Sequence, residues 1–488
     1  MATTLIQKGA TVDGFLIGEL IHTGGMAALR AVTRPGIQMP ILMKIPTMRE
    51  GDDPAAIVGF EMEQMILPRL SGIHVPKFVA ANDFSVHPYI VMERIGGQTL
   101  LRRLNDLPLP YAEVAAIGAK VAAALDDLHR QHVVHLDVKP SNIVMREDTG
   151  DAALVDFGLA HHDQLPDLMG EEFRVPYGTA PYMAPEQILG DRRDARSDLF
   201  ALGVLLYFFS TGVRPFGDPK GKRRLHRRLW RDPVPPRKRR ADFPPWLQEI
   251  ILRCLEVDPA QRYPTAAQLA FDLSHPGETK LTGRSERLKR DPWSAVIRRR
   301  FHPDFAPSAP RQAVLTQVSK APIVALAIDL AEGSEPLHEA LRVTATRILE
   351  TLPDARFACL NVLKHHRIAL DTTLDEEGRN KHLNRLVELK HWAQPLLALE
   401  NRITFHVLES ADPAAALLEY VRENRVDHIV MGARANSALR TLLGSVSQEV
   451  VAKAPCTVTV VRLPRPFDRD AEGPPGTPGD AADGSTTR

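Results

Sequence analysis

The chain reads HLDVKPSN at residues 135–142, and DFG follows at residues 156–158. Two carboxylates (Asp137 and Asp156), one amide (Asn142) and one ammonium group (Lys139) thus lie within twenty residues. Carboxylate and amide oxygens are hard ligands of the kind that Mg²⁺ takes, and a lysine supplies a point charge suited to phosphate. A lone DFG or His-x-Asp more often has a structural explanation, but the two at this spacing indicate a site.

The residues around this stretch predict an α+β arrangement. Apolar runs at 41–44 and 89–92 are typical of strands, and helical periodicity follows at 111–132 and 246–255. Strands first and helices later favour a small sheet-rich lobe followed by a larger helical one. The longest apolar stretch, 199–209, has eleven residues. It is far short of the ~20 that span a bilayer, so we interpret it as a buried helix.

Composition narrows the class of protein. The 488 residues are 44% hydrophobic and 25% charged, with a net charge of +1, which gives no reason to expect a nucleic-acid or membrane partner. The three cysteines (Cys254, Cys359 and Cys456) are far apart and form no disulfide or zinc pattern. The amino terminus lacks a signal pattern. We therefore expect a soluble, cytoplasmic protein.

The stretches at 135–142 and 156–158 resemble the catalytic loop and the metal-binding segment of protein kinases, and the resemblance extends through the first folded segment. It implies a bilobal protein-kinase fold that uses ATP and Mg²⁺. In that family Asp137 would be the catalytic base, and Asn142 and Asp156 would hold Mg²⁺. Lys139 would reach the γ-phosphate, and a lysine there is the pattern of Ser/Thr-specific members.

The resemblance also assigns residues upstream of the catalytic loop. Lys44 matches the lysine that pairs with the α- and β-phosphates. Glu63, in a helix expected over 59–70, matches the ion-pair partner of that lysine, and Glu61 is a close rival. Met92 would close the back of the adenine pocket. The backbone groups of residues 93–95, beginning with Glu93, would hydrogen-bond to the edge of the adenine ring.

The expected phosphate-covering loop departs from the family pattern Gly-x-Gly-x-x-Gly. It reads HTGGMA at 22–27, so that Gly24 and Gly25 remain while His22 and Ala27 replace the first and third glycines. Glycine lets a backbone approach phosphates closely, so the changes predict weaker nucleotide binding or an altered loop path. Without Lys44 downstream, the segment would be an ordinary hairpin turn.

Downstream, GTAPYMAPE at 178–186 resembles the end of a protein-kinase activation segment. Thr179 would hydrogen-bond the catalytic base, and Glu186 would form a buried pair with Arg262. Asp198 resembles the residue that holds the backbone of the catalytic loop. These features favour a protein substrate over a small molecule.

Two departures concern regulation. Leu136 stands where many kinases carry an arginine that a loop phosphate must neutralise. Residues 159–178 contain no Ser or Thr, only Tyr177, and they carry Glu171 and Glu172 instead. Our hypothesis is that activity does not depend on phosphorylation of this loop. The alternative is that the loop has merely drifted.

Residues 220–240 hold eleven Lys and Arg against a single acid, Asp232. Such a run is either a solvated loop or a docking surface, because clustered charge steers association. The partner would be an acidic substrate or an acidic face of a second domain. Pro233, Pro235 and Pro236 argue for an extended loop.

We divide the chain into five parts: an N-terminal segment 1–12, a kinase domain 13–275, a basic Pro/Arg-rich linker 276–319, a second domain 320–464 and a disordered tail 465–488. In the linker, Trp293, Val296, Ile297 and Phe301 suggest a short helix that docks on a neighbouring domain.

In the second domain, buried apolar strands alternate with helical stretches (335–351, 380–399, 413–424 and 446–452), which predicts an α/β parallel sheet with helices on both faces. Residues 427–446 and 455–462 resemble the end of Rossmann-like universal stress protein domains. ATP-binding members carry Gly-x2-Gly-x9-Gly-Ser/Thr, whose N–H groups wrap the phosphates.

The resemblance would place an adenine nucleotide at Asp329, Gly432, Gly444 and Ser445, with Val362 near the adenine. Here Ala435 replaces the second glycine of that pattern, and the Gly444–Ser445 pair stands one residue closer to it than the pattern requires. The domain either binds adenine nucleotide or serves a structural or dimerising role.

The sequence thus predicts a bacterial Ser/Thr protein kinase fused to a universal stress protein domain, acting in stress signalling. The second domain would be an adenine-nucleotide sensor or a homodimer interface. The rival interpretations are a pseudokinase scaffold, favoured by the altered glycine loop, and a small-molecule phosphotransferase.

Overall fold

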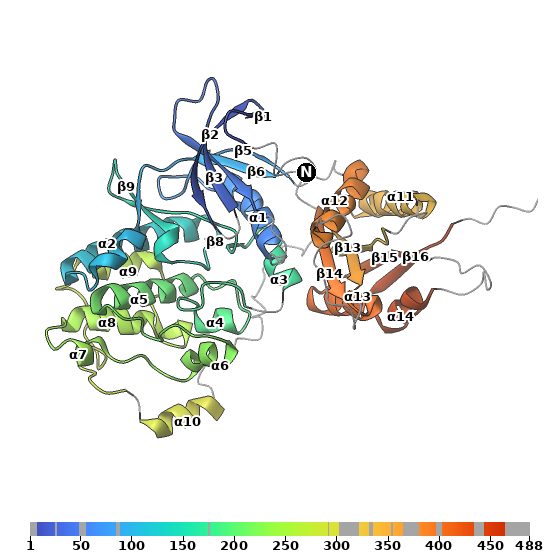
Figure 1. The fold of residues 1–488 in the computed structure, drawn as a ribbon. Helices are drawn as coiled ribbons and strands as arrows, with labels where there is room; N and C mark the ends of the chain where they lie inside the picture. The colour runs from blue at the N-terminus through green and yellow to red at the C-terminus, as the bar shows by residue number, and fades with distance from the viewer. Residues whose placement is uncertain are drawn as a thin grey trace, which may run out of the picture.

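The computed structural model describes residues 7–24, 27–47, 55–83, 88–173, 176–290, 292–301, 322–330, 335–352, 355–364, 380–396, 403–433 and 444–463. They form a two-lobed body followed by a separate α/β domain (Figure 1). Among them, no helix is long and apolar enough to cross a bilayer.

The first lobe is a six-stranded antiparallel sheet in the order β1-β2-β3-β4-β6-β5. Its strands are β1 (Thr11–Val12), β2 (Phe15–Thr23), β3 (Ala27–Thr33), β4 (Ile41–Pro46), β5 (Phe78–Asn82) and β6 (Tyr89–Glu93). One face buries Phe15, Val32 and Met43. The helix α1 (Ala55–Ile66) packs with Ile90 and Met92 of the other face.

The second lobe is helical, as expected. Its main helices are α2 (Tyr111–Arg130), α5 (Arg196–Thr211), α8 (Pro245–Cys254) and α9 (Ala266–Ser274). The apolar run predicted as a buried helix forms most of α5, which packs between α2 and α8. A Cβ atom on Gly203 would lie 2.5 Å from the Cβ of Cys254, so close packing requires glycine there.

Short elements line the junction of the lobes and the base of the second lobe. The strands are β7 (Gly97–Thr99), β8 (Val133–Val134), β9 (Ile143–Arg146), β10 (Ala152–Leu154) and β11 (His161–His162). The short helices are α3 (Leu168–Glu172), α4 (Pro185–Ile188), α6 (Lys222–Leu225) and α7 (Pro236–Arg239). The basic run 220–240 is therefore partly helical, and the loop expected from its prolines is limited to residues 231–235. Proline at the first helical position of α7 explains this, because its missing N–H is not needed there.

The second domain is a five-stranded, all-parallel sheet in the order β14-β13-β12-β15-β16. Its strands are β12 (Ile323–Ala327), β13 (Arg356–Lys364), β14 (Ile403–Ser410), β15 (His428–Gly432) and β16 (Thr457–Val461). The helices α11 (Glu335–Thr351) and α12 (Lys381–Ala393) cover one face, and α13 (Pro413–Glu423) and α14 (Ser445–Lys453) cover the other. The predicted Rossmann-like α/β domain is confirmed.

Between the domains, α10 (Trp293–Phe301) is the short helix expected in the linker, but its docking was wrongly predicted. Trp293 is 76% exposed and Phe301 71% exposed. Ion pairing replaces apolar docking, since Arg299 donates to Asp232 over 3.1 Å. Residues 302–321 and the expected disordered tail lie outside the described residues.

Candidate active site

The catalytic-loop backbone is held by Asp198, as expected. Its carboxylate, fully buried at the start of α5, accepts hydrogen bonds from the backbone N–H groups of His135 and Leu136, both at 2.8 Å. The Nε2 atom of His129 lies 2.9 Å from the same carboxylate. Leu136 (φ 62°) and Asp156 (φ 69°) lie in the left-handed region, which non-glycine residues occupy where their surroundings hold them.

The carboxylate of Asp137 stands at the centre of a cluster. Its Oδ1 accepts hydrogen bonds from the hydroxyl of Thr179 (2.7 Å) and from the N–H of that residue (3.1 Å). Its Oδ2 accepts from the amide of Asn142 (3.0 Å) and lies 2.6 Å from the ammonium group of Lys139. Lys139 also donates to the Thr179 hydroxyl over 3.0 Å. Residues from two distant segments thus orient one carboxylate.

A second cluster joins the two lobes. The ammonium group of Lys44, on β4, pairs with Glu63 on α1 and donates to Asp156 over 2.8 Å. Burial alone would lower the pKa of Lys44, but the two carboxylates raise it above its ordinary value. Proximity to Lys44 in turn holds the pKa of Asp156 below its usual range. The structure therefore brings Glu63 to the lysine, whereas the rival Glu61 lies 2.5 Å from the ammonium group of Lys390.

The donor set fits Mg²⁺. Asn142 uses its amide nitrogen on Asp137, and its Oδ1, which accepts one hydrogen bond from the Ser141 hydroxyl, keeps a second lone pair for a metal ion; Asp156 supplies an ionised carboxylate. In the described part of the chain, no three His, Cys, Asp or Glu residues gather as a metal site. Mg²⁺ is usually bound by one or two carboxylates together with substrate phosphates.

The expected nucleotide contacts are only partly described. Gly25 lies outside the described residues, and the N–H of Gly24 donates to the Ala27 carbonyl over 2.9 Å, closing the turn between β2 and β3. Met92 is buried in β6. Glu93 uses its N–H on the Lys77 carbonyl and its carboxylate on Arg146, so only its carbonyl can face adenine.

The segment after Thr179 is fixed by a buried ion pair. Glu186 and Arg262 form two parallel hydrogen bonds of 2.6 and 2.8 Å, and both side chains are almost fully buried. The hydroxyl of Ser197 adds a third bond to Glu186, at 2.6 Å. Gln187 donates to the Leu136 carbonyl over 2.8 Å, which ties this segment to the catalytic loop.

In the second domain, two predicted nucleotide residues share one sheet edge. Asp329 and Gly432 lie at the carboxyl ends of the neighbouring parallel strands β12 and β15. Gly444 and Ser445 begin α14, and residues 434–443 lie outside the described residues. Gly432 also has a packing role, because a Cβ atom there would lie 2.6 Å from Leu337.

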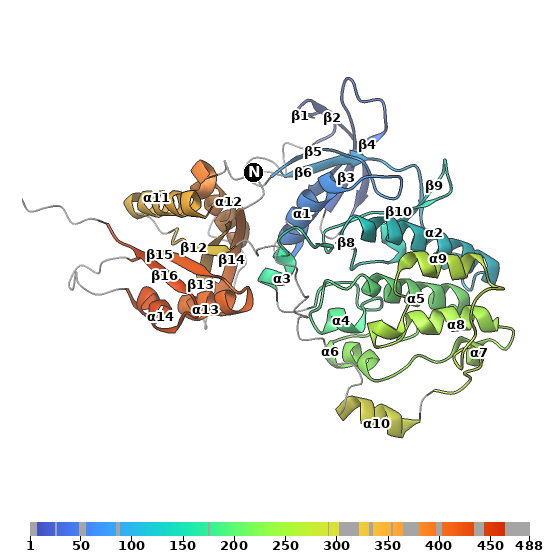
Figure 2. The same cartoon turned by 180° about the vertical axis from the view of Figure 1, so that it is seen from behind.

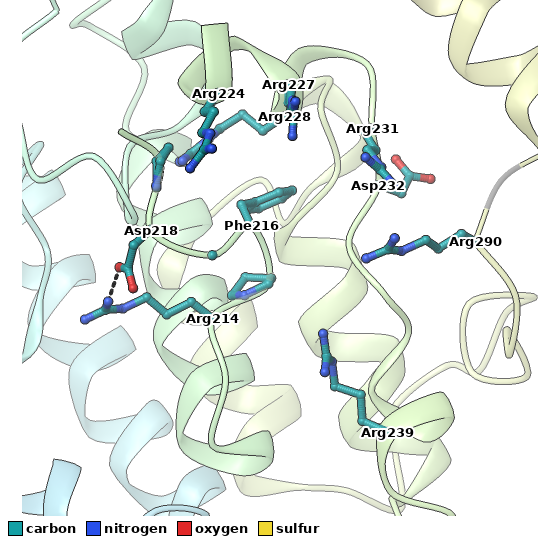
Figure 3. Close-up of a pocket in the computed structure, with 13 residues that line it drawn as sticks. Arg214, Phe216, Asp218, Arg224, Arg227, Arg228, Arg231, Asp232, Arg239 and Arg290 are labelled. Carbon is teal, nitrogen blue, oxygen red and sulfur yellow. Dashed lines mark hydrogen bonds and ion pairs between the residues drawn. The ribbon is translucent and has the colours of Figure 1, made fainter. Parts of the chain in front are cut away.

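A basic pocket of about 390 Å³ is lined mainly by charged residues, among them Arg228, which donates to the carbonyls of Ala180 and Met183 (Figure 3). Sequence analysis singled out the basic run 220–240, which supplies part of this pocket. It did not predict Arg214, Asp218 or Arg290, which lie outside that run. No sequence signal would have joined Arg290, fifty residues beyond the run, to this pocket.

Residues 19–272 match the model described as "Protein kinase domain", and residues 322–462 match that of the universal stress protein family. The serine/threonine-protein kinase PknB of Mycolicibacterium smegmatis is 31% identical over 269 residues, covering 54% of this chain and 42% of that protein. The kinase pkn3 of Myxococcus xanthus is 32% identical over 272 residues, covering 53% and 49%. The chain thus spans less than half the length of these relatives. The PknI kinase domain of Mycobacterium tuberculosis aligns at a TM-score of 0.43 and 24% identity, covering 55% of this chain and 98% of that structure.

Proposed function

The chain belongs to the protein kinase family, and on that basis we propose that it transfers the γ-phosphate of ATP to serine and threonine hydroxyls of proteins. The observation that carries the proposal is the pairing of Lys44 with both Glu63 and Asp156, next to an oriented Asp137. A phosphoryl-transfer transition state needs positioning and charge neutralisation more than covalent chemistry.

Each residue has a defined part in this proposal. Asp137 accepts the proton of the acceptor hydroxyl and aligns its oxygen, while Thr179 keeps the carboxylate in place. Lys139 neutralises charge on the transferred phosphoryl group. Asn142 and Asp156 would hold Mg²⁺, which supplies charge neutralisation between the phosphates. Lys44, fixed by Glu63, would orient the nucleotide.

The direct test is incorporation of ³²P from labelled ATP into the chain itself and into added proteins. Background incorporation by the wild type, equal to that of Asp137→Asn, would leave the pseudokinase scaffold as the better interpretation. Label that appears only in small molecules would favour a phosphotransferase. The segment 178–186, locked by Glu186 and Arg262, supports a protein acceptor instead.

We further propose a second adenine-nucleotide site at the carboxyl edge of the second domain, supported by Asp329 and Gly432 on neighbouring strand ends. Together with the bacterial kinases to which the chain is similar, the domain supports a role in bacterial stress signalling. Association of two chains through this domain is the alternative role.

Calorimetric titration of the full chain with ATP should give two sites per chain. Lys44→Met should remove one of them, and Asp329→Ala should weaken the other about tenfold or more, because hydrogen bonds to a charged group contribute about 1.5–3 kcal/mol. A single site that Lys44→Met abolishes would count against nucleotide binding by the second domain. Sedimentation of the same samples would then test the dimer.

A further inference from the structure

The second domain lies against the helices that shape the candidate active site. In both views, α12 and β14 face α1 and α3 (Figures 1 and 2). β14 is the edge strand of its sheet, and α3 belongs to the segment between residues 158 and 178. Leu386 and Val407 of the second domain share one buried apolar cluster with Leu168 and Met169 of α3. The two domains therefore pack through an apolar core.

Two glutamates of α3 are surrounded by groups of the second domain. Glu171 lies 2.6 Å from the guanidinium of Arg356 and accepts a hydrogen bond from the Tyr420 hydroxyl over 3.2 Å. Glu172 lies 3.3 Å from His382 and 3.8 Å from His406, and both histidines are buried. These contacts hold residues 171 and 172 in place without any phosphate.

Ionisation of this cluster agrees with its geometry. Burial would raise the pKa of Glu172, but its proximity to His382 and His406 holds that pKa below its ordinary value. Burial likewise opposes a charge on His382, yet Glu172 and Glu409 raise the pKa of His382 to about 9. The carboxylate of Glu172 thus stands as an anion beside a cationic His382, which is the kind of pairing that a loop phosphate otherwise makes.

A separate ion pair reaches α1. The ammonium group of Lys390, on α12, lies 2.5 Å from Glu61 and 3.6 Å from Asp83. Lys390 is largely buried, beside the ring of Phe405. Glu61 precedes Glu63 by two residues on the same helix. The contact that fixes Glu61 therefore also fixes the position of α1, and with it the pair between Glu63 and Lys44.

We propose that the second domain is a built-in activator of the kinase: by docking on α1 and α3, it holds the Lys44–Glu63 pair and residues 159–173 in the active arrangement. This inference rests on the proposed kinase function. Lys390 and Arg356 are positioning residues, since they act through Glu61 and Glu171 and touch neither substrate. The contact explains how α3 can be held in place in a segment that has no Ser or Thr to phosphorylate.

The test is charge reversal with rescue in the full chain. Lys390→Glu should lower kcat about tenfold or more, because it places a further carboxylate beside those of Glu61 and Asp83 in a largely buried contact. Lys390→Arg should keep most of the activity, and Glu61→Lys combined with Lys390→Glu should restore more activity than either change alone retains. The matched control is Lys453→Glu, which alters an exposed surface pair and should leave kcat unchanged.

Hydrogen exchange of α1 and α3 gives the second measurement, and Lys390→Glu should increase it while the exchange of α5 stays constant. Phosphatase treatment should leave wild-type kcat unchanged. Unchanged kcat and exchange in Lys390→Glu, or a rise in kcat, would overturn the proposal. An inactive wild type would instead count against the kinase function.

An independent observation concerns the basic pocket in Figure 3, where both acids are already paired. Asp218 pairs with Arg214, and Asp232 accepts from Arg287 and Arg299, each over 3.1 Å. These pairs leave neither carboxylate to balance the remaining arginines of the pocket.

Arg228 joins the pocket to the candidate acceptor site. Its buried guanidinium donates to the carbonyls of Ala180 (2.7 Å) and Met183 and lies 5.1 Å from the ring centre of Phe216. Burial without an anion lowers its pKa to about 10. Ala180 directly follows Thr179 and Met183 lies four residues after it, so the pocket adjoins the place where an acceptor protein would bind.

The other arginines of the pocket lack an anion. In the described ranges, the side chains of Arg224, Arg227, Arg231 and Arg290 make no hydrogen bond or ion pair. Arg239 donates only to the neutral hydroxyl of Tyr207, over 2.8 Å. Burial, and then the nearness of Arg231 and Arg239, lowers the pKa of Arg290. Like charges that converge on one concave surface favour an anionic occupant.

We infer that this pocket binds carboxylates of an acidic stretch in the acceptor protein, which makes the proposed kinase selective for acidic substrates. The second domain, which meets α1 and α3, leaves the pocket to another occupant. Dephosphorylated casein serves as the acidic probe and myelin basic protein as the basic one.

The variant Arg224→Gln/Arg227→Gln/Arg231→Gln should raise KM for casein about tenfold or more at low salt, with kcat within about twofold, because lost charge weakens association. KM for the basic protein should not rise. The control Arg102→Gln/Arg193→Gln/Arg422→Gln removes the same charge from exposed positions and should leave both constants unchanged. Equal effects on both acceptors, no effect on casein, or a wild type that labels only the basic protein would overturn the inference.

Discussion

Asp137→Asn should lower kcat for protein phosphorylation about a thousandfold, within the 10²–10⁴ range of general base catalysis. The amide keeps an oxygen for the Thr179 hydroxyl, but its nitrogen then meets two other donors, the amide of Asn142 and the ammonium group of Lys139. The acceptor hydroxyl loses its proton acceptor, and the local hydrogen bonds are mismatched.

The measurement is ³²P transfer under single-turnover conditions, with ATP affinity followed separately. ATP should bind the variant as it binds the wild type, because in this mechanism Asp137 contacts the acceptor and not the nucleotide. Asp163→Asn serves as the control, since this exposed carboxylate pairs with His132 and His162 and lies outside the Asp137 cluster. A variant that retains more than about a tenth of wild-type kcat would remove Asp137 from the role of base.

Arg262→Met should cost about 3–5 kcal/mol of folding stability, because it leaves Glu186 as a buried, uncompensated charge. The guanidinium also donates to the carbonyls of Glu256, Val257 and Arg196, and these bonds vanish with it. The unfolding temperature of the kinase lobes should fall by about 10 °C, given about 2–4 °C per kcal/mol for a domain of this size.

Thermal denaturation of three variants tests this prediction. Replacing both partners, with Glu186→Leu and Arg262→Met, should cost less than Arg262→Met alone, since no buried charge then remains. The control Arg385→Met breaks the exposed pair with Glu388, and the unfolding temperature should barely change. A fall of less than about 3 °C for Arg262→Met would show that the pair contributes little to stability.

Several assignments followed from local sequence because they depend on short spacings. The stretch 135–142 places the base, the lysine and the amide on one loop, and hydrogen bonds from Asn142 and Lys139 to Asp137 reproduce that cluster. The strands and helices of the second domain could also be predicted from local sequence, since strands buried on both faces of a parallel sheet form continuous apolar runs.

Other features needed the tertiary structure. Spacing alone left Glu61 and Glu63 as rivals, and the way that α1 packs decided between them, with Glu63 toward Lys44 and Glu61 toward Lys390. The linker helix was predicted to dock through Trp293, yet that side chain is exposed, and an arginine pair anchors the helix. Periodicity shows which face of a helix is apolar but not whether a neighbour covers it.

By itself, the sequence determined the order of two folds and predicted a set of catalytic residues, because both rest on residues close together along the chain. Only the tertiary structure placed Glu171 and Glu172 against Arg356, His382 and His406, and Arg290 beside the basic run. These contacts join residues 50 to 250 positions apart, and their formation depends on how whole elements pack. Glu171 and Glu172, which the sequence shows only as acids in a loop without Ser or Thr, lie in the folded chain where the two domains meet.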